Sequence, residues 1–302
     1  MKLLPALASA TALFISCAGV ANAQQQACKS PVPDSALVKK GTLTMSVNPT
    51  LPPMQFVDQS GALKGMRVEL GEQIAKRLCL TPEYVRIEFS AMIPGLQAGR
   101  WDVINTGIFY TDERAKLMQM LPYEDQAISI STAKGNPLKI TKPEDLSGKS
   151  IGVEIGGFEE RKARELDKQL TDKGMKGMTI RTFENFAMAF QALRAGQVEV
   201  ALSIDSTGAE YQKRGDFDRV LNGLFPTPVA LAAKNKELSV AMAKALNDMK
   251  ADGSFQKLFD QYGVKAFDGA VSVKGRAGSR PAPTCNARRF HGTRLELVGV
   301  CR

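Results

Sequence analysis

The stretch FSAMIPGLQAGRWDVI, residues 89–104, decides the fold class of this chain. Residues 93–98 have the composition of a short helix, and Gly99 ends it, since glycine tolerates the left-handed backbone found at helix ends. Residues 101–104, Trp-Asp-Val-Ile, then indicate a strand that leads into Asn105-Thr106-Gly107. A helix followed within a few residues by a buried strand is typical of α/β proteins.

The same alternation continues on both sides of this stretch. Strands are expected at residues 41–47, 84–89, 149–153, 179–183 and 198–204, with helices between them and at the C-terminal side. This order predicts an α/β fold with mostly parallel sheets that are covered by helices. Two such α/β units follow one another along the chain.

Residues 1–23 have the organisation of a secretory signal peptide. Lys2 precedes an apolar run at residues 3–18, and Ala21-Asn22-Ala23 supplies a cleavage site with small residues. A lipoprotein signal with an acylated Cys17 is the alternative, which Phe14 disfavours because leucine is usual there. We expect cleavage after Ala23 and a periplasmic mature protein.

The formal charge of +9 is unevenly distributed. The segment 274–302 contains seven basic residues and one acid, Glu296, so it carries +6. Lys2 adds one more charge, which leaves +2 on the rest of the chain. A nearly neutral body does not resemble a surface that tracks nucleic-acid phosphates. Residues 269–302 are expected to form a disordered basic tail, for which RNA binding is the alternative role.

Four cysteines follow the expected cleavage site: Cys28, Cys79, Cys285 and Cys301. We favour a disulfide between Cys28 and Cys79, because it would tie the N-terminal segment to the first helix in an oxidising compartment. A buried free thiol at Cys79 is the alternative. The cysteine spacing and a single histidine, His291, indicate no metal site, and no cofactor is expected.

The motifs together resemble the solute-binding proteins of ABC importers, in the family that binds polar amino acids. The resemblance covers residues 41–263, and its most specific part is the stretch 89–104 followed by Gly107 and Thr111-Asp-Glu-Arg114. It implies a type II periplasmic-binding-protein fold, with two mostly parallel sheets, flanking helices and two hinge strands at residues 128–132 and 228–232. The implied parts are an N-terminal segment (24–40), lobe 1 (41–127 and 228–268) and lobe 2 (128–227).

Arg114 is the first candidate for a ligand contact. A cation in the first turn of a helix opposes the helix dipole, at a cost of about 0.3–1 kcal/mol that a bound anion would reverse. A guanidinium group also binds a carboxylate through two parallel hydrogen bonds. The resemblance implies that Arg114 holds the α-carboxylate of the ligand, and a surface ion pair is the alternative.

The resemblance also implies ligand contacts at glycine and aromatic positions. The backbone of Gly107 would approach the ligand, and Phe89 would pack on its side chain unless it is an ordinary core residue. Gly156 and Gly157 precede a helix, so their amides could meet the carboxylate from the second lobe, or the two glycines only form a turn.

Several positions depart from the family pattern. Phe109 stands where a hydroxyl residue is common, and Leu51 and Met54 stand where aromatic residues are common. Ile204 occupies the usual place of the acid that binds the α-ammonium group, and Asp205 follows one residue later. Asp205 is therefore expected either to bind the amine or to cap the following helix.

The sequence thus predicts a monomeric, non-catalytic protein that passes an amino acid or a related carboxylate to an inner-membrane ABC permease. One alternative is a cyclohexadienyl dehydratase-like enzyme on the same scaffold, with Asp205 or Glu154 as the general acid. The other is a ligand sensor that docks to a membrane receptor.

Overall fold

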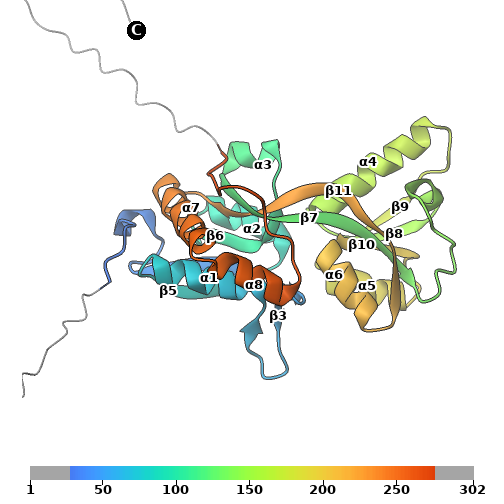
Figure 1. Cartoon of the computed structure of the whole chain (residues 1–302). Helices are drawn as coiled ribbons and strands as arrows, with labels where there is room; N and C mark the ends of the chain where they lie inside the picture. The colour runs from blue at the N-terminus through green and yellow to red at the C-terminus, as the bar shows by residue number, and fades with distance from the viewer. Residues whose placement is uncertain (1–27, 276–302) are drawn as a thin grey trace, which may run out of the picture.

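The computed structural model of the protein describes residues 28–275. The expected signal peptide (1–23) and the part of the basic tail from residue 276 lie outside the described residues. Figure 1 shows two α/β lobes joined by two long, adjacent strands, β7 and β11. This arrangement confirms the predicted fold class.

The main sheet contains eight strands in the order β5-β1-β6-β11-β7-β10-β8-β9. Parallel pairs form its two ends, where β1 pairs with β5 and β6 in lobe 1, and β8 pairs with β9 and β10 in lobe 2. The strands at these two ends are β1 (Thr42–Val47), β5 (Thr81–Arg86), β6 (Val103–Phe109), β8 (Ser150–Glu154), β9 (Thr179–Phe183) and β10 (Val200–Ile204).

Two antiparallel strands connect these ends. β7 (Gln119–Ala133) and β11 (Phe217–Ala233) pair from Gln119–Ala233 to Ala133–Phe217, and both predicted hinge segments lie within them. Because β11 also pairs with β6 and β7 pairs with β10, the two expected sheets form one continuous hydrogen-bonded ladder. The register of β7 against β11 shifts at several points, which interrupts the regular pairing between the lobes.

Helices cover both parts of the sheet (Figure 1). Lobe 1 carries α1 (Met66–Arg77), α2 (Phe89–Gln97), α3 (Asp112–Leu117), α7 (Lys236–Ala251) and α8 (Ser254–Tyr262), and lobe 2 carries α4 (Phe158–Asp172), α5 (Phe186–Arg194) and α6 (Asp205–Lys213). The remaining elements are the small sheet β2 (Thr50–Leu51), β3 (Gln55–Val57) and β4 (Leu63–Lys64), and 3₁₀ turns at Asp34–Ala36 and Pro143–Leu146.

The stretch 89–104 folds as a packed helix–strand unit whose boundaries differ from the prediction. α2 begins at Phe89 rather than at residue 93, because its apolar side chains Phe89, Met92 and Leu96 share one buried face. Trp101 packs on Gly95 of this helix so closely that a Cβ atom there would lie 2.0 Å from the indole ring. This contact explains why a glycine stands in the middle of the helix.

The predicted start of the tail at residue 269 is wrong. Val271 is buried, and its backbone exchanges hydrogen bonds with the side chain of Asn247 in α7. Lys274 forms a β-bridge with Met120 of β7. The packed part of lobe 1 therefore continues to at least Lys274, because Val271 is buried and the backbone of Lys274 pairs with that of Met120 in β7.

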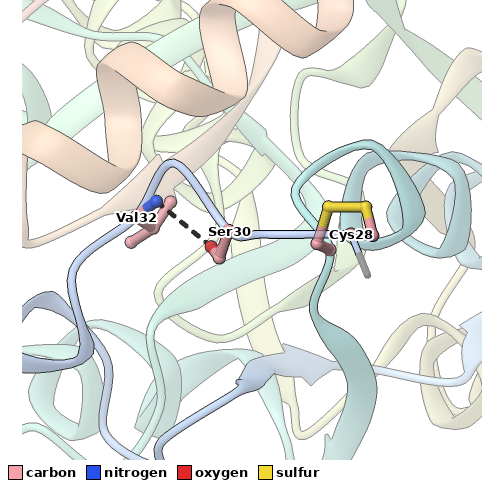
Figure 2. The surroundings of a disulfide bond; sticks show 4 residues. Cys28, Ser30 and Val32 are labelled. Atoms are coloured by element: carbon pink, nitrogen blue, oxygen red, sulfur yellow. Dashed lines mark hydrogen bonds between the residues drawn. A yellow bond between two sulfur atoms is a disulfide. The ribbon is translucent and has the colours of Figure 1, made fainter. Parts of the chain in front are cut away.

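The N-terminal segment is joined to the first helical region by a disulfide between Cys28 and Cys79, whose Cα atoms lie 5.6 Å apart (Figure 2). Close by, the backbone N–H of Val32 donates to the Ser30 hydroxyl at 3.1 Å. Across residues 28–275, no helix is both long and apolar enough to span a bilayer.

Candidate functional site

A small cavity lies between the two lobes. Most of the predicted ligand contacts line it, namely Arg114, Gly107, Phe89, Phe109, Leu51 and Gly157. The other lining residues are Thr106 of lobe 1 and Glu154, Phe158, Glu159 and Ile204 of lobe 2. The structure therefore brings residues from both lobes to one enclosed site.

Arg114 is positioned by the start of α3. The Thr111 side chain caps this helix by accepting the Arg114 backbone N–H at 3.2 Å. The guanidinium donates to the carbonyl of Phe109 at 2.9 Å and to the carbonyl of Gly156 in lobe 2 at 3.3 Å. Burial lowers the pKa of Arg114 to about 10, so the group remains a cation at neutral pH.

Aromatic rings from both lobes form the apolar wall of the cavity. Phe109 of β6 stacks on Phe158, the first residue of α4, with ring centroids 4.5 Å apart and an interplanar angle of 27°. The Arg114 guanidinium lies 5.4 Å from the centroid of Phe89. Phe109 thus makes an aromatic contact across the cleft.

Gly107 lies above a buried ion pair that sequence reasoning missed. Its φ is +76°, and a Cβ atom at this position would lie 2.1 Å from Cζ of Arg67. Arg67 and Glu124 are both fully buried, and their charged atoms approach to 3.1 Å. Arg67 also donates to the Thr106 carbonyl at 3.1 Å, so this pair supports the floor of the cavity. Glycine is required here because only glycine leaves room for the guanidinium.

Two buried carboxyl groups of lobe 2 face the cavity. Glu154 ends strand β8 and is 4% exposed, and Glu159 lies in the first turn of α4 and is 2% exposed. Burial raises the pKa of Glu154 well above its ordinary range and raises the pKa of Glu159 to about 7. Glu159 is absent from the predicted contacts, and Glu154 appears there only as a possible general acid. The sequence signal for Glu154 was an acid at the end of an apolar strand, just before the turn that contains Gly156 and Gly157.

The two glycines follow the alternative expectation, because they form the turn between β8 and α4. The Gly156 N–H donates to Oε2 of Glu160 at 2.7 Å, and the Gly157 N–H donates to the Glu154 carbonyl at 3.3 Å. Both amides therefore have partners within lobe 2. Only Gly157 lines the cavity, and Gly156 reaches the site through its carbonyl contact with Arg114.

Asp205 lies away from the cavity. β10 ends at Ile204, which lines the cavity. Asp205 is the first residue of α6 and does not line it. Its Oδ2 accepts the Gly223 N–H at 3.0 Å, and its Oδ1 lies 3.9 Å from Arg219. Both partners belong to β11, so the Asp205 carboxyl group is held there and does not line the cavity.

Two α/β lobes that enclose a cavity lined by a cation, carboxylates and aromatic rings define a hinged ligand-binding protein. The chain belongs to the bacterial extracellular solute-binding proteins, family 3, whose sequence model matches residues 43–265. This result confirms the family resemblance that the motifs indicated.

Individual relatives agree with this assignment. The L-cystine-binding protein TcyJ of Escherichia coli (strain K12) is 29% identical over 230 residues, which cover 74% of this chain and 83% of TcyJ. The structure resembles an ancestral arginine-binding protein bound to arginine, with a TM-score of 0.68 and 33% identity, covering 74% and 98% of the two chains. It also resembles an ancestral amino acid-binding protein described as a precursor of cyclohexadienyl dehydratase, with a TM-score of 0.65, 28% identity and coverage of 74% and 95%.

Proposed function

We propose that this protein binds an amino acid in the interlobe cavity and delivers it to the permease of an ABC importer. The observation that carries the proposal is the placement of Arg114 of lobe 1 and Glu154 of lobe 2 along one enclosed cavity. A free amino acid has an anionic and a cationic group on the same carbon atom, and it needs one partner of each kind. We further propose that the mature chain acts in the periplasm after cleavage of the signal peptide.

In this proposal the Arg114 guanidinium binds the α-carboxylate in the place where it now donates to two carbonyl oxygens. The α-ammonium group binds Glu154, which takes the role that the sequence suggested for Asp205. Closure about β7 and β11 removes both ion pairs from water and strengthens them. The stacked rings of Phe109 and Phe158 then cover the ligand from the two lobes.

The experiment is isothermal titration calorimetry against the common amino acids, with protein that has been unfolded and refolded to remove any co-purified ligand. We expect at least one amino acid to bind, Arg114→Ala to weaken binding by about 100-fold or more, and Arg114→Lys to restore part of it. Arg100→Ala, at an exposed position near α2, is the matched control. Binding by Arg114→Ala as tight as that of the parent would refute the proposed site.

The dehydratase alternative receives a separate test, because Glu154 and Glu159 are protonatable groups inside the cavity. The refolded protein is incubated with prephenate and arogenate, and the products are followed by absorbance. We expect no turnover, and product formation that Glu154→Gln abolishes would replace binding by catalysis. Uptake of the bound amino acid through a reconstituted permease would distinguish import from a sensor role.

A further inference from the structure

Beneath the cavity, Arg67 of α1 connects three strands through its guanidinium group. It donates three hydrogen bonds to the Glu124 carboxylate of β7, one to the Thr106 carbonyl of β6 and one to Oε1 of Gln55 in β3, all at 3.1–3.2 Å. These bonds equal the number of N–H donors of a guanidinium group. Arg67, Gln55 and Glu124 are 0% exposed, and none of the three lines the cavity.

These bonds orient the peptide group between Thr106 and Gly107, two residues that do line the cavity. Because a peptide group is planar, a fixed Thr106 carbonyl also fixes the direction of the Gly107 N–H. Nε2 of Gln55 donates to the same carbonyl at 3.0 Å and to the Thr106 hydroxyl at 2.9 Å. The floor of the cavity is therefore held from below by Arg67 and Gln55.

Further hydrogen bonds extend this arrangement to lobe 2 and along the connecting strand. The Thr106 hydroxyl accepts the backbone N–H of Asn48 at 3.2 Å, and Nδ2 of Asn48 donates to Glu154 of lobe 2 at 2.9 Å. In β7, Nε2 of Gln126 donates to Oε1 of Glu124. A continuous series of hydrogen bonds thus runs from lobe 2, beneath the cavity, to the strand that joins the lobes.

Stability alone does not account for a buried ion pair at this place. Apolar side chains of similar volume are often as stabilising as such a pair or more so, because burial removes two charges from water. On the basis of the proposed function, we infer that Arg67 and Glu124 are positioning residues for the ligand. They hold the cavity floor in register with β7, so that ligand binding and closure of the lobes occur together, and they act through Thr106 and Asn48.

The first experiment removes the pair without leaving a buried charge. In Arg67→Met/Glu124→Leu, apolar side chains fill the space and the net charge is unchanged, so the protein should remain folded, which urea unfolding checks. Calorimetry is carried out with each common amino acid, and the comparison uses the one that the parent binds most tightly. We expect the double variant to bind it about 3- to 30-fold more weakly.

A double-mutant cycle distinguishes positioning from a general structural role. Asn48→Ala should weaken binding in the parent but have little further effect in Arg67→Met/Glu124→Leu, because both changes interrupt the same series of bonds at Thr106. A general loss of stability would leave the two effects additive. Arg77→Ala, at an exposed position in the last turn of α1, is the matched control and should be additive with Asn48→Ala.

Hydrogen exchange measures whether the effect of the ligand reaches β7. The ligand should slow amide exchange in Gln119–Ala133 of the parent, and less so in the double variant at the same fractional saturation. Gln126→Leu is a milder second variant, because it removes one bond to Glu124 and leaves the ion pair in place. It should also reduce the protection of β7.

The outcomes separate the two proposals. A folded Arg67→Met/Glu124→Leu protein that binds like the parent, or additive effects of Asn48→Ala, would overturn the positioning role while leaving amino-acid binding intact. If the double variant does not fold, Gln126→Leu decides, and unchanged protection of β7 would overturn the inference. If the refolded parent binds no amino acid, the proposed function fails, and this inference fails with it.

Discussion

Asn48 of lobe 1 donates a hydrogen bond from Nδ2 to Oε1 of Glu154 in lobe 2, at 2.9 Å. Asn48 directly follows strand β1, and Glu154 is the last residue of strand β8 and lines the cavity. Asn185 of lobe 2 makes a second contact of this kind to Glu88 of lobe 1, at 3.2 Å. Side-chain hydrogen bonds therefore connect the lobes beside the cavity, and Glu154, the proposed partner of the ligand amine, takes part in one of them.

We predict that Asn48→Ala favours the open arrangement of the lobes. Oε1 of Glu154 would lose its partner, which typically costs about 1–3 kcal/mol for a buried polar group. Small-angle X-ray scattering of the ligand-free variant should give a larger radius of gyration, and amino-acid affinity should fall about tenfold. Gln256→Ala, in an exposed position of α8, is the control. A variant with the scattering and affinity of the parent would show that this contact does not influence closure.

We predict that Glu159→Gln stabilises the ligand-free protein in alkaline solution. The folded protein raises the pKa of Glu159 from 4.5 to about 7, so between these values the native state binds more protons than the unfolded state. This group therefore lowers the free energy of unfolding as the pH rises through that window, by about 3 kcal/mol in total.

Urea unfolding at pH 5 and pH 8 measures this effect. Glu159→Gln should match the parent at pH 5 and exceed it by about 1–3 kcal/mol at pH 8. Glu165→Gln should keep the pH dependence of the parent. A constant difference between Glu159→Gln and the parent at both pH values would contradict the prediction.

We predict that Gly107→Ala destabilises the protein more than Gly99→Ala. Both glycines have a positive φ, +76° and +70°, so alanine would carry a similar backbone strain of about 1–2 kcal/mol at either position. No atom lies within 4 Å of a Cβ at Gly99, whereas a Cβ at Gly107 would overlap the Arg67 guanidinium. Urea unfolding should show an additional loss of about 2 kcal/mol or more for Gly107→Ala. Equal losses would mean that Arg67 moves aside without cost.

We predict that the disulfide between Cys28 and Cys79 stabilises the folded state by about 2–4 kcal/mol, since it closes a loop across 51 residues. The Cys28→Ser/Cys79→Ser protein should unfold at a lower temperature than the oxidised parent. Reductant should bring the parent to the same midpoint. A double variant as stable as the oxidised parent would show that the bond contributes nothing.

Much of the fold could be predicted from local pattern alone. The apolar periodicity, the glycine after α2 and the cap at Thr111 indicate elements whose stability depends on residues a few positions apart. The same local signals placed Arg114 in the first turn of a helix, where a cation is unfavourable without a nearby anion. The boundaries of α2 and of the tail differed, because the buried face of Phe89, Met92 and Leu96 decided the first and pairing with β7 decided the second.

The sequence by itself thus determined the α/β alternation, the two serial units and the cationic side of the site. Only the tertiary structure decided which acids oppose Arg114, because the end of β10 directs Ile204 into the cavity and leaves Asp205 outside it. It also paired Arg67 with Glu124, 57 residues apart, beneath Gly107. Side-chain direction at a strand end and contacts between distant segments depend on register and lobe packing, which local periodicity does not specify.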